Sequence, residues 1–152
     1  MTPRLATDPA LWPGILDLLH AAFADMAGRI DPPSLVAALT PEALTRQSLT
    51  GEIWVIGAPV ACMVLTPQPQ ALYLGKLAVA QAHRGQGLAR SLVDLATGRA
   101  RALGLPAVEL QTRIELTENQ TLFQALGFTE TVRTAHPGFD RPTSITYRRA
   151  LD

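Results

Sequence analysis

The segment from Leu72 to Leu103 constrains the fold more than any other part of the chain. Its beginning, Leu72–Val79, is an apolar run that predicts a buried strand. After a short connection, the sequence Arg84-Gly85-Gln86-Gly87-Leu88-Ala89 leads into a stretch in which apolar residues recur at helical spacing. Such a loop is suited to hold an anion, because the first N–H groups of a helix lack intrahelical partners and the helix dipole favours negative charge there.

Two familiar phosphate-binding motifs are absent from this loop. A G-x-G-x-x-G fingerprint that begins at Gly85 needs a glycine where Arg90 stands, and the chain has no G-x-x-x-x-G-K-S/T run. The pattern that remains is Arg-x-x-Gly-x-Ala at Arg84, Gly87 and Ala89. Small residues at these positions leave backbone amides free to meet a pyrophosphate, whereas a tight turn before a helix explains the same glycines without a ligand.

The composition predicts a single folded domain over residues 1–152. Hydrophobic residues make up 47% and charged residues 17% of the chain, which excludes a disordered chain. Thirteen basic residues balance thirteen acidic ones, which argues against nucleic-acid binding because that function favours a basic excess. Cys62 is the one cysteine, so the chain can form neither an intrachain disulfide nor a cysteine-based metal cluster, and we expect a buried apolar role for it.

The hydropathy pattern predicts no membrane association. No apolar run approaches the ~20 residues that a membrane span needs, and the N-terminus lacks a charged-then-apolar signal pattern. We therefore expect a cytoplasmic protein that has no membrane partner and binds no metal.

Hydrophobic periodicity and breaker residues divide the chain into helices and strands. Strands are expected at 4–7, 52–56, 60–65, 72–79, 107–112, 128–133 and 143–149, and helices at 11–26, 34–39, 40–48, 87–103 and 117–126. Thr40 is a predicted N-cap, and Thr117 with Gln120 matches a capping box. The order of elements indicates an antiparallel meander followed by a right-handed parallel crossover. The predicted fold class is α/β, with a mixed, mostly antiparallel central sheet and flanking helices.

Four motifs occur together at a characteristic spacing: the strand end Leu77-Ala78-Val79, the loop 84–89, the helix that ends at Gly104, and the block from Asn119 to Phe128. In these motifs and in its element order, the chain resembles the GNAT superfamily of acetyl-CoA-dependent N-acetyltransferases. The resemblance is strongest between residues 72 and 128. It implies the GNAT fold, acetyl-CoA as cosubstrate, and transfer of the acetyl group to a primary amine of a small molecule or peptide.

The resemblance also implies a coenzyme site. The residues expected there are Leu77, Ala78, Val79, Arg84, Gly85, Gln86, Gly87, Leu88, Ala89, Asn119 and Phe123. The backbone of 77–79 pairs with the pantetheine arm and offers an N–H to the thioester oxygen, while the amides of 85–89 hold the pyrophosphate with added charge from Arg84. Asn119 matches a family asparagine that contacts the coenzyme arm, and hydrogen bonding at the helix terminus explains an asparagine there equally well.

The catalytic groups are less well defined by the resemblance. Phe123 stands where many relatives carry a tyrosine that protonates the leaving thiolate, and phenylalanine cannot donate a proton. Tyr73 and Tyr147 are the replacement candidates. Glu115 ranks first and His136 second as the base for the attacking amine. A solvated charge or an ion pair also explains Glu115, and the proline and glycine after His136 also indicate a plain surface turn.

Substrate contacts are expected from the loops 27–34 and 134–142 and their neighbours. The candidate residues are Arg29, Asp31, Arg113 and Arg141, and their mixed signs leave the charge of the substrate open. Lys76 is a further candidate to meet an anionic substrate group, with extension of its side chain to the sheet edge as the alternative.

Two expectations concern the whole molecule. Because Phe123 replaces the usual acid, the alternative function is a non-catalytic acyl-CoA-binding or regulatory module on the same fold. The open edge strands of such a sheet also lead us to expect a homodimer.

Overall fold

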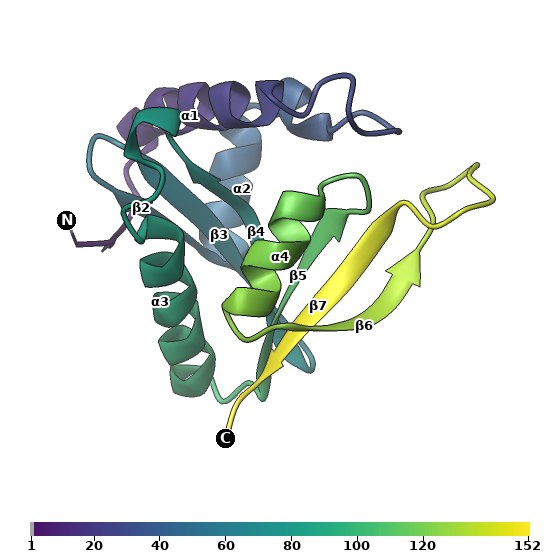
Figure 1. The fold of residues 1–152 in the computed structure, drawn as a ribbon. Helices are drawn as coiled ribbons and strands as arrows, with labels where there is room; N and C mark the ends of the chain where they lie inside the picture. Colours follow the sequence, from purple (N-terminus) through teal and green to yellow (C-terminus); the bar gives the residue numbers. More distant parts are fainter. Residues whose placement is uncertain (1) are drawn as a thin grey trace.

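The computed structural model, which describes residues 2–152, contains a seven-stranded sheet with the order β1-β2-β3-β4-β5-β7-β6 (Figure 1). The strands are β1 (Arg4–Leu5), β2 (Glu52–Ile56), β3 (Ala61–Gln68), β4 (Ala71–Val79), β5 (Ala107–Arg113), β6 (Thr129–Thr134) and β7 (Ser144–Ala150). The helices are α1 (Trp12–Ala24), α2 (Pro41–Thr50), α3 (Leu88–Ala102) and α4 (Thr117–Ala125), with 3-10 turns η1 (Pro9–Leu11), η2 (Leu35–Ala38) and η3 (Gln81–His83). The predicted mixed α/β class is confirmed.

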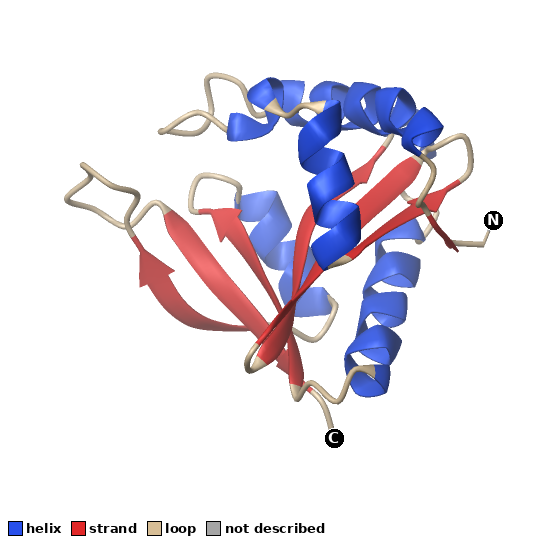
Figure 2. Cartoon of the chain, turned by 180° about the vertical axis from the view of Figure 1, so that it is seen from behind, coloured by secondary structure: helices blue, strands red, loops and turns tan. Residues whose placement is uncertain are grey.

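One pair of neighbouring strands is parallel, and the others are antiparallel. Strands β2, β3 and β4 form the predicted meander, and α3 carries the chain from β4 to the parallel strand β5. The pairing of β4 with β5 joins Leu72 to Val108 and Tyr73 to Glu109. Beyond Tyr73 the two strands diverge, and both views show the sheet opening into a V at this point (Figures 1 and 2).

Helices cover both faces of the sheet and define two cores. On one face, α3 and α4 pack over a core that includes Leu72, Leu92 and Phe128. On the other face, α1 and α2 pack over a second core that includes Trp12 and Leu44. Seen from behind, α2 lies in front of the sheet, while β5, β7 and β6 carry no helix on that side (Figure 2). No helix within residues 2–152 has both the length and the apolar character that a membrane crossing requires.

The helix N-termini test two sequence predictions. Thr40 caps α2 as predicted, since its Oγ1 accepts a hydrogen bond of 3.2 Å from the backbone N–H of Ala43. The capping box at Thr117 is wrong: the N-cap of α4 is Leu116, which makes no side-chain cap. Leu116 is buried and its carbonyl accepts the first helical bonds, so the helix begins one residue earlier, and the side chain of Gln120 donates instead to the Ile114 carbonyl at 2.9 Å.

Cys62 lies in the core under α1, as expected for a small apolar residue. Burial raises the pKa of its thiol to about 12. The thiol is therefore protonated at neutral pH and is a poor nucleophile.

A partly buried ion pair ties α3 to the start of β2. The guanidinium of Arg99 donates to both carboxylate oxygens of Glu52, at 2.9 Å from Nε to Oε1 and 2.6 Å from Nη2 to Oε2. Trp54 Nε1 donates to the same carboxylate at 2.9 Å. The hydrogen bond from Arg99 is the main reason that the pKa of Glu52 lies below its ordinary value.

The Glu52→Gln variant is expected to unfold more easily at neutral pH, by about 1–2 kcal/mol, because a charge-assisted pair is lost. The lowered pKa makes this contribution fully present above pH 4.5, and it is lost as the pH falls through the pKa of the folded state. Urea denaturation of both proteins between pH 7 and pH 3 measures the difference. The control is Glu130→Gln, which breaks an exposed pair with Arg133 and is expected to have a smaller effect.

Candidate functional site

Within the opening between β4 and β5, strand β4 carries a bulge. Gly75 pairs with Val64 of β3 and Ala78 pairs with Cys62, so two residues of β4 lie opposite one residue of β3. Within the bulge, Lys76 has a φ of 52°, the one positive φ among the non-glycine residues described. This conformation is unfavourable for a residue with a side chain and is typical of functional sites. After the bulge, 77–79 pairs with β3 on one side and has no strand on the other.

The N-terminus of α3 lies next to this open strand edge. Gly87 is the N-cap with a φ of 77°, and no side chain caps the first turn. Gly85 also has a positive φ of 78°, a conformation that glycine adopts without strain. The Arg84 side chain turns back toward the strand, with Nε 3.4 Å from the carbonyl of Val79, and its guanidinium lies 3.6 Å from the carboxylate of Asp25.

A cavity of about 610 Å³, the large cavity, lies between the end of β4, the start of α3, α4 and the end of α1. All the residues predicted to hold the coenzyme line it except Gln86. Asn119 reaches across to β5, with Nδ2 3.4 Å from Thr112 Oγ1, rather than capping its own helix. The structure thus brings together two segments, 77–89 and 119–123, that the sequence analysis placed in one site.

A smaller cavity of about 180 Å³, the strand cavity, fills the V between the diverging strands. Tyr73, Gly75 and Lys76 line it from β4, and Gln111 and Arg113 line it from β5. Five residues line both cavities: Phe23, Met26, Leu77, Asn119 and Phe123. The two cavities therefore adjoin beside Leu77, on the part of β4 that no longer pairs with β5.

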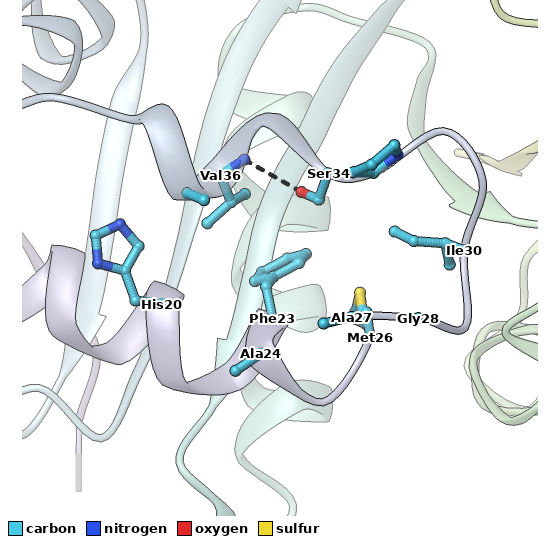
Figure 3. Close-up of a pocket in the computed structure, with 11 residues that line it drawn as sticks. His20, Phe23, Ala24, Met26, Ala27, Gly28, Ile30, Ser34 and Val36 are labelled. Atoms are coloured by element: carbon cyan, nitrogen blue, oxygen red, sulfur yellow. Dashed lines mark hydrogen bonds between the residues drawn. The ribbon is translucent and has the colours of Figure 1, made fainter.

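A third cavity of about 520 Å³, the α1 cavity, lies between the end of α1 and η2. Figure 3 shows Phe23 between the two elements, and the turn opposite is held by a 3.2 Å hydrogen bond from the Val36 N–H to Ser34 Oγ. Phe23, Met26, Ile30 and Ser34 line both the α1 cavity and the strand cavity. The three cavities form a continuous series along the C-terminal end of α1.

The tyrosines and Phe123 occupy different places relative to these cavities. Phe123 lies at the boundary of the first two cavities and packs on Phe128 and Tyr147, at centroid distances of 6.2 and 6.3 Å. Tyr147 is buried in the core beneath α4 and lines none of the three cavities. Tyr73 lines the strand cavity, and burial raises the pKa of its hydroxyl. Of the two replacement candidates, Tyr73 is the one that the fold brings to the site.

The structure does not bring the two predicted bases to the site, since neither Glu115 nor His136 lines any of the three cavities. Glu115 Oε2 accepts a 3.1 Å hydrogen bond from the Asp31 N–H, and its Oε1 is buried without a partner. The ring of His136 contacts the hydroxyl of Thr143 within the β6–β7 loop. Both side chains organise loops rather than the space between the strands.

The predicted substrate residues are largely engaged in fastening the loop 27–34 to the C-terminal half of the chain. Arg29 pairs with Glu118 at 2.7 Å, and Asp31 pairs with Arg141 at 3.2 Å. Arg113 donates to the carbonyls of Pro32 and Pro33 at 2.5 and 3.4 Å. Arg29 also lines the large cavity and Arg113 the strand cavity, whereas Asp31 and Arg141 line none of the three.

Sequence reasoning missed the role of α1. Phe23 of α1 and Met26 of the turn after it belong to the apolar stripe of the helix expected at 11–26, which predicts core packing, yet both line all three cavities. The sequence feature that indicated this role was the loop rich in glycine and proline immediately after the helix. Such a loop ends the helix, so the last apolar residues of the stripe lie beyond the sheet.

The model of the acetyltransferase (GNAT) family matches residues 12–128 of this chain. The chain belongs to this family. The match confirms the resemblance to this family drawn from the strand, loop and helix motifs.

Among curated proteins, this GNAT acetyltransferase is similar to N-alpha-acetyltransferase 30 of Saccharomyces cerevisiae, with 29% identity over 75 residues. The match covers 46% of the present chain and 43% of the yeast protein, which is less than half of that relative.

Solved structures share the fold over the whole chain. A GNAT acetyltransferase from Staphylococcus aureus superposes with a TM-score of 0.75 at 15% identity, covering 99% of this chain and 100% of the other. A GNAT acetyltransferase from Elizabethkingia anophelis with acetyl-CoA bound gives a TM-score of 0.66 at 19% identity, covering 99% and 97%. These likenesses confirm the predicted GNAT fold.

The Glu115→Ala variant is expected to loosen the loop 27–34, because the hydrogen bond to the Asp31 N–H is lost. Amide hydrogen exchange of residues 28–34 is expected to accelerate several-fold while the strands keep their protection. Glu130→Ala, which removes an exposed ion pair on β6, is the matched control and leaves the loop unchanged. Unaltered exchange in Glu115→Ala contradicts the fastening role of this carboxylate.

Proposed function

We propose that this GNAT acetyltransferase transfers the acetyl group of acetyl-CoA to a primary amine of a small molecule or peptide by direct attack of the amine. The observation that carries the proposal is the series of adjoining cavities around the open edge of β4. The large cavity has room for the pyrophosphate and for the extended pantetheine arm of the coenzyme. The strand cavity gives the acceptor amine a separate space.

The start of α3 fits the pyrophosphate of the coenzyme. Its first-turn N–H groups are uncapped, and positive φ angles at Gly85 and Gly87 keep side chains away from them. Arg84 and Arg90 also line the large cavity. Arg90 forms no ion pair within residues 2–152, so its charge is free to meet a phosphate.

The open edge at 77–79 fits the pantetheine arm, because an extended chain can add to an unpaired strand through backbone hydrogen bonds. Bound acetyl-CoA supplies the activated acetyl group as a thioester. Leu77 lines both cavities, so a backbone N–H of this edge is the proposed oxyanion donor. Asn119 and Phe123 close the opposite wall of the same passage.

The strand cavity favours a neutral amine. Among the residues described, its ionisable lining side chains are Tyr73, Lys76 and Arg113, and none of the lining residues is aspartate, glutamate or histidine. Two cations lower the pKa of an amine that enters beside them, because like charges disfavour its protonated form. We propose that the amine proton leaves to solvent, and that neither Glu115 nor His136 takes it directly.

Tyr73 is the proposed acid for the departing thiolate. Tyr73 lines the strand cavity, and a tyrosine hydroxyl carries its proton at neutral pH, so it is available to donate that proton from the cavity wall. In this arrangement Phe123 contributes packing at the boundary between the large cavity and the strand cavity, and the proton comes from Tyr73 of β4.

The Tyr73→Phe variant is expected to lower kcat by at least about tenfold, because general-acid assistance is lost while the ring and its packing remain. Affinity for CoA is expected to stay unchanged, since the strand cavity is separate from the pyrophosphate end. Tyr147→Phe is the matched control, as it removes a buried hydroxyl from outside the cavities. Stopped-flow detection of thiol release and calorimetry of CoA binding measure the two quantities. Equal kcat in Tyr73→Phe and wild type excludes this acid.

The Gly87→Ala variant is expected to weaken CoA binding by roughly tenfold, since a methyl group enters the space beside the uncapped amides and strains a φ of 77°. Gly104→Ala is the control, because Gly104 has a φ of 72° at the far end of α3 and carries the same backbone strain. Thermal shift and calorimetry compare the two. An equal loss of CoA affinity in both variants contradicts a pyrophosphate site at Gly87.

The alternative function, a non-catalytic acyl-CoA-binding module, is favoured by one observation: Phe123 replaces the usual acid at the cavity boundary. Incubation with acetyl-CoA and a panel of primary amines distinguishes the two. Thiol release above the background with any amine supports the transferase. Tight coenzyme binding without release for every amine supports the module.

A further inference from the structure

The charge around the strand cavity is one-sided. Lys76 and Arg113 are the charged residues that line it, and they enter from the two strands that diverge there. Arg113 donates to two backbone carbonyls, which are neutral and leave its positive charge uncompensated. Lys76 forms no ion pair within residues 2–152, and burial lowers the pKa of its ammonium group.

The nearby acids are engaged elsewhere. Glu109 of β5 pairs with Arg148 at 2.9 Å, and Glu115 accepts from the backbone of Asp31. Neither lines the strand cavity. Because half-buried cations without an anion are unfavourable, a ligand that brings a carboxylate to this place gains charge-assisted hydrogen bonds.

The continuation of the strand cavity is apolar. Phe23, Met26 and Ile30 lead from it into the α1 cavity, where Val36 lies on the opposite wall (Figure 3). A ligand held by its carboxylate between the strands can therefore place an apolar substituent under α1. The third direction, through Leu77 and Phe123, leads to the proposed position of the thioester.

We propose that the acceptor amine is an apolar α-amino acid, with its carboxylate between Lys76 and Arg113 and its side chain in the α1 cavity. This inference rests on the proposed acetyl transfer. In such a molecule the amine is bonded to the same carbon as the carboxylate and the side chain. It therefore lies at the junction of the three cavities, facing the open edge of β4. A peptide has a neutral amide in place of this carboxylate and leaves the two cations uncompensated.

The test compares acceptors that differ in one group each, at saturating acetyl-CoA. L-leucine carries both features, L-leucinamide and 3-methylbutylamine lack the carboxylate, glycine lacks the apolar substituent, and leucyl-glycinamide represents a peptide. We expect kcat/KM for leucine to exceed that of every other acceptor by at least about tenfold, the usual effect of an unpaired charged group. Calorimetry of each acceptor with the protein–CoA complex measures binding independently of turnover.

Variants of Lys76 test whether this side chain is responsible for the preference for an acceptor with a carboxylate. Lys76→Met is expected to lower kcat/KM for leucine at least about tenfold more than kcat/KM for 3-methylbutylamine, while Lys76→Arg retains the charge and most of the preference. Arg101→Met, an exposed position of α3 far from the cavities, is the matched control. An equal loss for all acceptors in both Lys76 variants overturns the assignment, because it indicates a role in proton transfer.

The remaining outcomes separate this inference from the proposed function. If the acceptors without a carboxylate, or the peptide, react as well as leucine, the amino-acid assignment is overturned and acetyl transfer is left intact. Tight leucine binding without thiol release supports the carboxylate site and contradicts the transferase. Equal binding of all acceptors overturns the inference whatever the turnover.

Discussion

The bulge at Lys76 is the constraint on which the rest of the site depends. A residue with a side chain holds a φ of 52° there, and two residues of β4 face one of β3. The extra residue redirects the strand, so β4 leaves β5 after Tyr73. The separation exposes the backbone of 77–79 and creates the strand cavity. A regular β4 would pair with β5 along its length and leave room for neither coenzyme nor acceptor.

The two faces of the sheet give the two sides of this opening different chemistry. On the face of α3 and α4, an uncapped helix N-terminus and arginines line the large cavity, where we propose that the pyrophosphate and the extended arm of the coenzyme bind. On the face of α1, the lining combines two cations with apolar side chains of the helix. Phe23 and Phe123 stand where the cavities meet. Both are apolar, so the reacting groups are expected to meet in a passage of low polarity, where hydrogen bonds from the backbone are stronger than in water.

The loop 27–34 forms part of the wall on the side where we propose that the acceptor amine binds. It crosses from α1 to the C-terminal half and is held by Glu115, Glu118 and Arg141 through exposed or half-exposed contacts. Such contacts are individually weak, and several together set the position of a loop. The predicted substrate residues Asp31 and Arg141 therefore hold the loop in place, while other residues of the same loop, such as Ile30 and Ser34, line the cavities together with residues of α1, β4 and β5.

The fold class and the order of elements follow from the sequence because each depends on neighbours along the chain. The residues proposed for the coenzyme side come from the family resemblance of the motifs at 77–89 and 119–128. Alternating and helical periodicity identify β4 and α3, and two glycines identify the loop between them. The tertiary structure decided the rest. Arg141 and Asp31 are 110 residues apart, and Arg113 and Pro32 are 81 apart. Which charges pair, and which of them face the V of the sheet, depends on packing between distant segments that no local pattern encodes.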